Sequence, residues 1–222
     1  FRKTESQRFR LNFAQCNITE VLKETHVRFT SLAKQKGLEF TLQVPEKDFY
    51  AHVNQEAFTK IISNLLNNGM KYAESYVHVM LEIPETDDDN LFRIRTVNDG
   101  VIIPDEMKEE IFKPFVRFNE QEDGKVTTGT GIGLALSRSL AELHQGTLAM
   151  ETGEESNIFC LTLPVVQDMT ITLTPEAEVE IDRVNEIPAE QAGRKDNRPT
   201  VLVVEDNPDM LTFVVRQFSR DY

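Results

Sequence analysis

The segment TTGTGIGLALS, residues 127–137, constrains the fold more than any other part of the chain. Gly129, Gly131 and Gly133 are followed at once by an apolar run typical of a helix. Backbone N–H groups at such a helix start bind anions, and glycine permits the tight turn and the close approach. The segment lacks the Gly-Lys-Ser/Thr of a P-loop, and it follows a polar loop where a dinucleotide fingerprint needs a strand. It therefore predicts a phosphate-binding helix that follows a long mobile loop, which could close over a triphosphate.

The rest of the chain up to residue 165 alternates between two hydrophobic periods. The helical period predicts three amphipathic helices, over residues 19–36, 54–68 and 131–145. Asn17 or Thr19 is the expected cap of the first of them, and Gly37 its expected end. Alternating apolar residues predict strands at 10–18, 38–44, 76–83, 91–97, 147–152 and 157–165, the last two as a hairpin-like pair. The segment DEMKEEIFKPF (105–115) is expected to form a further short helix.

Composition excludes several classes of protein. The net charge of −13 argues against non-specific binding to DNA or RNA, which requires a positive surface. No apolar run approaches the roughly 18 residues that span a bilayer, and no signal peptide is expected. Cys16 and Cys160 lie far apart in strand-like runs, as expected of reduced core residues in a cytosolic protein. The four histidines show no metal-ligand clustering.

The composition changes after residue 164. Residues 165–198 are rich in Glu, Asp, Thr and Pro, which predicts a mostly extended linker. After Pro199, TVLVVEDNPDML reads as a buried strand and an acidic turn, and an amphipathic helix follows. Because one strand and one helix cannot bury their own apolar faces, we expect the start of a truncated α/β domain. The chain does not begin with Met, so we expect it to be either an excised piece of a longer protein or a processed product.

Two further polar clusters could join the glycine-rich segment in one site. In NLLNNGMKYA (64–73), Asn64 and Asn68 share a helix face, and an amide oxygen suits Mg²⁺ beside phosphates. Lys71 can hold a phosphate, although an Asn-rich helix end explains the segment equally well. In NDGVIIP (98–104), a glycine after a strand lets the backbone approach a flat ligand, and a side-chain oxygen can accept from an adenine amino group. Taken alone, an ordinary turn is the better explanation of this segment.

Together these segments resemble a known family. NLLNNGMKYA, NDGVIIP, IFKPF and GTGIGLALS, in this order and spacing, are similar to the N, G1, F and G2 boxes of bacterial sensor histidine kinases, which belong to the Bergerat-fold ATPases. The resemblance covers about residues 11–164. It implies an α+β fold, a two-layer α/β sandwich with a mixed sheet packed on three helices and a mobile ATP lid. It also implies ATP and Mg²⁺ as ligands.

The two ends of the chain also resemble parts of a hybrid sensor kinase. FRKTESQRFRLNF resembles the end of a dimerisation helix, and VLVVEDNPDML resembles the first strand and acidic turn of a receiver domain. The implied organisation is a helix remnant (1–10), an ATP-binding catalytic domain (11–164), an acidic linker (165–199) and the start of a receiver (200–222).

The resemblance assigns roles to individual residues. Asn68 matches the Mg²⁺-coordinating asparagine, Lys71 a phosphate-contacting lysine, Tyr72 an aromatic residue beside the nucleotide, and Arg117 a basic residue near the γ-phosphate. Lys71 and Arg117 are the implied catalytic pair. The other implied ATP-binding positions are Asn64, Asn98, Gly100, Ile102, Phe115, Gly129, Thr130, Gly131, Ile132, Gly133 and Leu134. Phe112 and Phe115 match the pair that anchors the lid, and Glu205 and Asp206 match the acidic pair that holds Mg²⁺ in an intact receiver.

Two residues depart from the family pattern, Asp-x-Gly-x-Gly. Asn98 stands at the adenine-reading aspartate and Ile102 at the second glycine. Asparagine keeps an oxygen that accepts from the adenine amino group but loses the charge, which weakens the hydrogen bond. Asp99 is not expected to replace the missing acid, because the neighbouring position points elsewhere. We therefore expect weaker nucleotide binding.

The resemblance implies transfer of the γ-phosphoryl group of Mg-ATP to a histidine on upstream dimerisation helices, and then to a receiver aspartate. No histidine of this chain lies in a phosphoacceptor-like helix, so we expect nucleotide binding without autophosphorylation. The implied partners are those helices and the receiver domain on the same chain, with no nucleic acid. The implied full-length protein is a homodimer anchored in the inner membrane, with this part cytoplasmic.

Three alternatives remain open from the sequence. They are an ATPase of the chaperone or topoisomerase type, a pseudokinase of the same fold that senses a partner, and a pure interaction domain. The receiver-like tail argues against the first. The matched Asn68, Lys71 and glycine-rich helix start argue against the other two.

Overall fold

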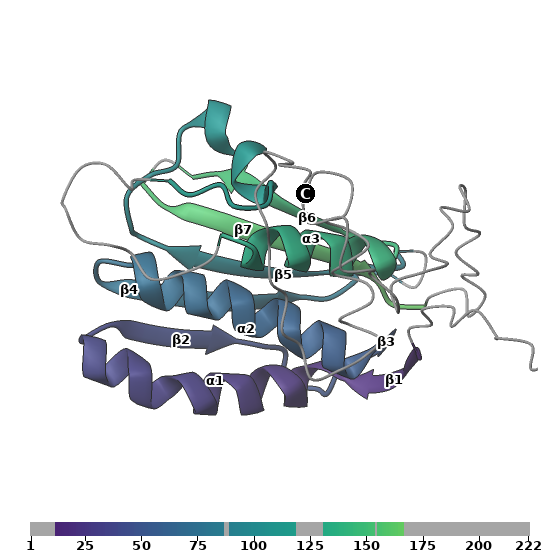
Figure 1. The fold of residues 1–222 in the computed structure, drawn as a ribbon. Helices are drawn as coiled ribbons and strands as arrows, with labels where there is room; N and C mark the ends of the chain where they lie inside the picture. Colours follow the sequence, from purple (N-terminus) through teal and green to yellow (C-terminus); the bar gives the residue numbers. More distant parts are fainter. Residues whose placement is uncertain (1–11, 87–88, 119–130, 154, 167–222) are drawn as a thin grey trace, which may run out of the picture. The chain divides into compact units, whose positions relative to one another are not determined.

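A five-stranded mixed sheet carries three helices on one face (Figure 1). The computed structural model describes residues 12–86, 89–118, 131–153 and 155–166. The strand order is β2 (Glu39–Gln43), β4 (Tyr76–Glu82), β5 (Leu91–Asn98), β7 (Asn157–Pro164) and β6 (Thr147–Thr152). The β2–β4 pair is parallel and the other three pairs are antiparallel. This confirms the α+β two-layer arrangement and the hairpin of the last two strands.

The helices begin where polar caps occur in the sequence. They are α1 (Ile18–Lys36), α2 (Gln55–Tyr72) and α3 (Gly133–Leu143). The side chain of Asn17 accepts from the Glu20 N–H at 3.1 Å to cap α1, and Gly37 ends α1 with a φ of 71°. Helix α2 runs one turn beyond the expected residue 68. Within the described residues, no helix is long and apolar enough to cross a membrane.

Two elements differ from the sequence prediction. A short strand, β3 (Tyr50–Val53), was not expected, and it pairs antiparallel with β1 (Ala14–Asn17). The single helix predicted over 105–115 is wrong: the chain forms two separate 3₁₀ turns, η1 (Asp105–Met107) and η2 (Glu110–Phe112). Proline at 114 disfavours helical backbone in the residue before it, and Lys113 is extended with a ψ of 144°.

The core lies between the sheet and the helices. Alternate residues of β5 face this layer, so that Phe92, Ile94 and Thr96 are buried and Asn98 continues the same row. The largest side chains in the core are Phe58, Phe92, Ile18, Leu22, Ile61, Ile62, Leu65, Leu66, Met70, Ile94, Leu140 and Leu148. Cys16 and Cys160 are both buried and form no disulfide, as expected, but Cys160 lies on the face of the sheet away from the helices, beside Arg95.

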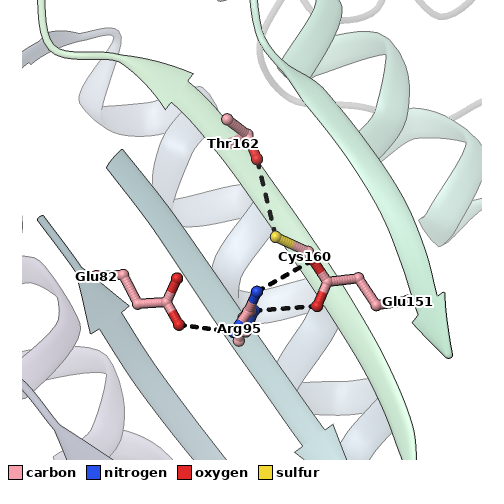
Figure 2. Close-up of polar contacts among 5 residues, drawn as sticks. All are labelled: Glu82, Arg95, Glu151, Cys160 and Thr162. Carbon is pink, nitrogen blue, oxygen red and sulfur yellow. Dashed lines mark hydrogen bonds and ion pairs between the residues drawn. The ribbon is translucent and has the colours of Figure 1, made fainter. Parts of the chain in front are cut away.

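On the opposite face of the sheet, Arg95 lies between two acids from different strands (Figure 2). Its guanidinium is 2.8 Å from Glu82 on β4 and 3.0 Å from Glu151 on β6. Cys160 and Thr162 of β7 lie beside it, with 3.8 Å between sulfur and hydroxyl oxygen. Because these charges are about one-third exposed, the ion pairs contribute less than about 1 kcal/mol each. They connect the strands across this face, on the side of the sheet away from the candidate site.

Candidate functional site

The end of α2 and the loop after β5 meet at Gly100. A Cβ atom on Gly100 would lie 1.9 Å from the carbonyl oxygen of Tyr72 and 2.8 Å from its carbonyl carbon. Only glycine allows backbones to approach this closely. The first two sequence clusters, around Asn68 and around Asn98, are therefore neighbours in space, although nearly thirty residues separate them along the chain.

The side chain of Asp99 also connects the loop after β5 to the residues that follow α2. Its carboxylate accepts from the backbone N–H groups of Glu74, Ser75 and Tyr76 at 3.0–3.1 Å, and from the Ser75 hydroxyl. Burial alone would raise the pKa of Asp99, but the hydrogen bonds from Ser75, Tyr76 and Glu74 outweigh it and lower the pKa well below its usual range. The carboxylate is thus committed to the turn between α2 and β4, and it does not serve position 98.

Asn98 ends the buried row of β5 on the helix-covered face of the sheet. It is only 3% exposed. Its side-chain carboxamide makes no hydrogen bond with any residue in the described ranges. The carboxamide nitrogen lies 3.1 Å from the place where a Gly100 Cβ would stand. The residue that matches the adenine-reading acid is therefore buried near the end of α2, and its side-chain donor and acceptor have no hydrogen-bond partner among the described residues.

Asn157, at the start of β7, holds the loop in shape and was not identified from the sequence. Its side chain accepts from the Ile103 N–H at 3.0 Å and donates to the carbonyl oxygens of Gly100 at 3.3 Å and Val101 at 3.0 Å. It is 3% exposed. An asparagine that opens an apolar strand looks like an ordinary turn residue. Its partners lie more than fifty residues earlier, so no local pattern indicates this contact.

The glycine-rich helix start is tied to α2 by Asn64. The Asn64 amide donates to the Gly133 carbonyl oxygen and to the Ser137 hydroxyl, both at 3.1 Å. Ile132 precedes the helix and cannot cap it with its side chain, and the first turn contains no acidic residue. The N–H groups of this turn are therefore not engaged by a side chain at the cap, as an anion-binding helix start requires.

The two ends of the expected lid meet at its base. The Phe115 N–H donates to the Gly131 carbonyl oxygen at 3.0 Å. Both residues have positive φ, 65° for Phe115 and 71° for Gly131, and a Cβ on Gly131 would lie 2.9 Å from the Phe115 Cα. Phe112 is buried and packs edge-on against Phe159, with the ring centroids 6.4 Å apart. The base of the segment between the F-box-like and glycine-rich motifs is thus closed by backbone contacts.

The remaining matched residues lie on these same elements. The Lys71 ammonium donates to the Tyr72 hydroxyl at 2.8 Å and lies 4.5 Å from the ring centroid of Tyr72, which is 43% exposed. Asn68 is half-buried one helical turn after Asn64, and Arg117 is exposed. Ile102 is exposed, and Ile132, Gly133 and Leu134 are half-buried at the start of α3. Gly129, Thr130, Glu205 and Asp206 lie outside the described residues.

Comparison with known proteins gives a consistent result. A family model described as "Histidine kinase-, DNA gyrase B-, and HSP90-like ATPase" matches residues 53–167, just over half of the chain. Histidine kinase P4 of Formosa agariphila is 28% identical over 239 residues, covering 100% of this chain and 17% of that protein. Sensor histidine kinase TmoS of Ectopseudomonas mendocina is 28% identical over 240 residues, covering 99% of this chain and 24% of that protein.

Among solved structures, a nucleotide-free catalytic domain of histidine kinase ThkA is 25% identical, with a TM-score of 0.60. The match covers 70% of this chain and 97% of that domain. The chain spans less than a quarter of the length of P4 and TmoS. The fold, the ordered motifs and the family match agree, and the chain therefore belongs to the histidine kinase-, DNA gyrase B- and HSP90-like ATPase family, as a catalytic ATP-binding domain of the histidine kinase type.

Proposed function

We propose that this domain binds Mg-ATP and donates its γ-phosphoryl group to a histidine on upstream dimerisation helices, for relay to a receiver aspartate. One observation supports the proposal: residues of three separate motifs lie together around α2 within the described domain. Gly100 packs on the last residue of α2, and Asn64 of the same helix holds the start of α3. This arrangement supports a nucleotide site in which the adenine-reading, metal-holding and phosphate-binding positions of the family lie on α2 and its neighbours.

Each end of the nucleotide then has a chemical counterpart. In this proposal the Asn98 carboxamide reads the edge of the base, and the Tyr72 ring, which is 43% exposed, is available to contact the nucleotide. Lys71 and Arg117 supply positive charge, and the start of α3 supplies backbone N–H groups. Lys71 exchanges its bond to the Tyr72 hydroxyl for a phosphate oxygen when nucleotide binds. Such a site works by positioning and charge neutralisation, which is what phosphoryl transfer needs from a protein.

The residues present fit a magnesium ion that is bound mainly by phosphates. The side chain of Asn68 makes no hydrogen bond to any residue in the described ranges, so its amide oxygen is available as a ligand. Those ranges contain no group of three or more His, Cys, Asp or Glu side chains that could hold a metal alone. Mg²⁺ accepts this arrangement, since one protein oxygen can be completed by phosphates and waters. When bound, it would neutralise phosphate charge, and Asn68 would hold and orient it.

The phosphoryl acceptor is proposed to lie outside this domain. His144 is fully buried, with Nδ1 bonded to the Leu140 carbonyl oxygen at 2.7 Å and Nε2 accepting from the Asn54 N–H at 3.2 Å. His26 lies on α1 and packs against Phe40 of β2, with the two ring centroids 4.3 Å apart. Neither presents a free imidazole on a helix suited to in-line transfer.

The organisation around this domain is also proposed. The helix remnant (1–10), the linker (165–199) beyond its first two residues, and the receiver start (200–222) with Glu205 and Asp206 lie outside the described residues. The alignments to P4 and TmoS extend over essentially the whole chain, which supports kinase-like flanks on both sides. Dimerisation through upstream helices and membrane anchorage of the full-length protein belong to the same proposal.

A nucleotide-sensing module without phosphoryl transfer is the second candidate. The uncharged Asn98 and the branched Ile102 are the observations that favour it. The two candidates differ in one experiment, in which the chain is extended upstream through the dimerisation helices and incubated with labelled ATP. Phosphohistidine in the extended protein, with none in the present chain, supports the kinase. Labelling of the present chain alone contradicts the proposed position of the acceptor, and binding without any labelling of the extended protein favours the sensor.

A further inference from the structure

Asn98 differs from three other amide and acid side chains of the site, those of Asn64, Asn157 and Asp99. Asn64 is oriented by two hydrogen bonds, Asn157 by three, and Asp99 by donors from three consecutive residues. Asn98 is as buried as Asn157, yet no residue in the described ranges orients its carboxamide. Gly100 also leaves room beside it, since a Cβ there would lie 3.1 Å from the Asn98 amide nitrogen. Within the described residues, no hydrogen bond therefore determines whether the oxygen or the nitrogen of this amide faces a ligand.

The chemistry of the amide gives this freedom a consequence. An ionised carboxylate can only accept hydrogen bonds, whereas a carboxamide offers one accepting oxygen and two donating N–H groups. Adenine presents a donating 6-amino group beside an accepting N1. Guanine and hypoxanthine present an accepting O6 beside a donating N1–H. A carboxylate oxygen repels O6. A carboxamide can accept from the adenine amino group in one orientation, and after a turn of 180° its N–H group can donate to O6.

We propose that Asn98 allows this site to accept 6-oxopurine nucleotides, those of inosine and guanosine, as well as adenine nucleotides. The inference rests on the proposed nucleotide site and adds the class of base that the site takes. It follows from the substitution at position 98 together with the unrestrained amide. The aspartate that stands there in the family imposes a preference for the 6-amino group, and this chain lacks that preference.

The test compares ADP, IDP and GDP, each with Mg²⁺, by isothermal titration calorimetry on the chain itself. IDP differs from ADP at the 6-position and N1 without adding a 2-amino group, so it probes Asn98 alone. We expect ADP and IDP to bind the parent chain within about threefold of each other. Asn98→Asp should prefer ADP over IDP by about tenfold or more, the usual size of one base-edge discrimination. Gln43→Glu adds the same charge on the exposed edge strand β2 and should keep the parent ratio.

Each outcome decides between the claims. A tenfold preference of the parent chain for ADP over IDP overturns the inference and leaves the ATP site intact. Binding of IDP but not of GDP would overturn the inference for guanosine nucleotides and keep it for inosine nucleotides. No binding of any of the three contradicts the proposed nucleotide site itself. If Asn98→Asp fails to fold, the ADP-to-IDP ratio of the parent chain still tests the inference.

Discussion

Asn157→Ala tests whether the loop after β5 is held by one buried side chain. The substitution removes an acceptor from the Ile103 N–H and donors from the carbonyl oxygens of Gly100 and Val101. All three partners are backbone groups of the loop that follows Asn98. No other residue of β7 is seen to bond to this loop within the described ranges. The loop should therefore lose its defined shape.

The magnitude follows from the burial of the groups left unpaired. A buried polar group without a partner costs about 1–3 kcal/mol. Val101 is 57% exposed, so water can replace the lost bond there, whereas Gly100 is buried and Ile103 is half-buried. The Gly100 carbonyl oxygen therefore bears the full cost of an unpaired buried group, and the Ile103 N–H bears part of it. We expect the free energy of unfolding to fall by about 2–4 kcal/mol. That is a large share of the roughly 5–15 kcal/mol that stabilises a domain.

Urea unfolding and calorimetric ADP binding, both at a temperature where the variant is folded, measure the two effects. Misplacement of the loop should weaken ADP binding about tenfold or more, since displacements near 1 Å at a site carry costs of this order. Asn90→Ala is the matched control, because Asn90 makes two hydrogen bonds to the Val166 backbone but is exposed. It should change stability by less than about 0.5 kcal/mol and leave ADP binding unchanged.

Two results would refute this reasoning. A stability loss of Asn157→Ala equal to that of Asn90→Ala would show that the three hydrogen bonds of Asn157 contribute less to stability than expected. An unchanged ADP affinity in a folded, destabilised variant would show that the loop shape does not matter to the nucleotide. Asn157→Asp refines the test. It keeps an acceptor for Ile103 and places a carboxylate against two carbonyl oxygens, so it should also weaken ADP binding.

Three further substitutions probe neighbouring features. Gly100→Ala should cost about 1–3 kcal/mol in urea unfolding and weaken ADP binding, because its Cβ would collide with the Tyr72 carbonyl oxygen; an unchanged stability would contradict the close approach. Burial lowers the pKa of His144, so the unfolded chain binds more protons and the parent loses stability as the pH falls below about 6.5. His144→Gln, which keeps an acceptor for the Asn54 N–H, should show a smaller loss between pH 7 and 5; equal slopes would refute this. Asp99→Asn should destabilise the domain by about 1–3 kcal/mol at neutral pH. Because the folded pKa of Asp99 is lowered, its contribution is present above the unfolded value near 4, and the difference from the parent should shrink below about pH 4; a constant difference would count against the charged hydrogen bonds.

The sequence predicts well the features that local patterns determine. The start and end of α1 follow from Asn17 and Gly37, whose side-chain and conformational preferences act within a few residues. The strands with clear alternation, such as β4 and β5, appear where they are expected. Four motifs in a fixed order indicate the family, because each carries a residue type that its chemistry requires.

What the sequence cannot predict depends on contacts between distant segments. β3 is only four residues long and exists because β1 pairs with it. The helix predicted over 105–115 is replaced by two 3₁₀ turns, and Pro114 explains the extended backbone of Lys113 that ends the second turn. Asn157 becomes part of the site only when β7 lies beside β5.

The most direct test of the central claim is Mg²⁺-dependent binding of a non-hydrolysable ATP analogue to the chain and to its Asn68→Ala variant. The account predicts binding by the parent chain that weakens when Mg²⁺ is chelated. It also predicts that Asn68→Ala binds more weakly and loses most of the response to Mg²⁺. No binding by the folded parent chain at millimolar nucleotide would contradict the assignment of this site.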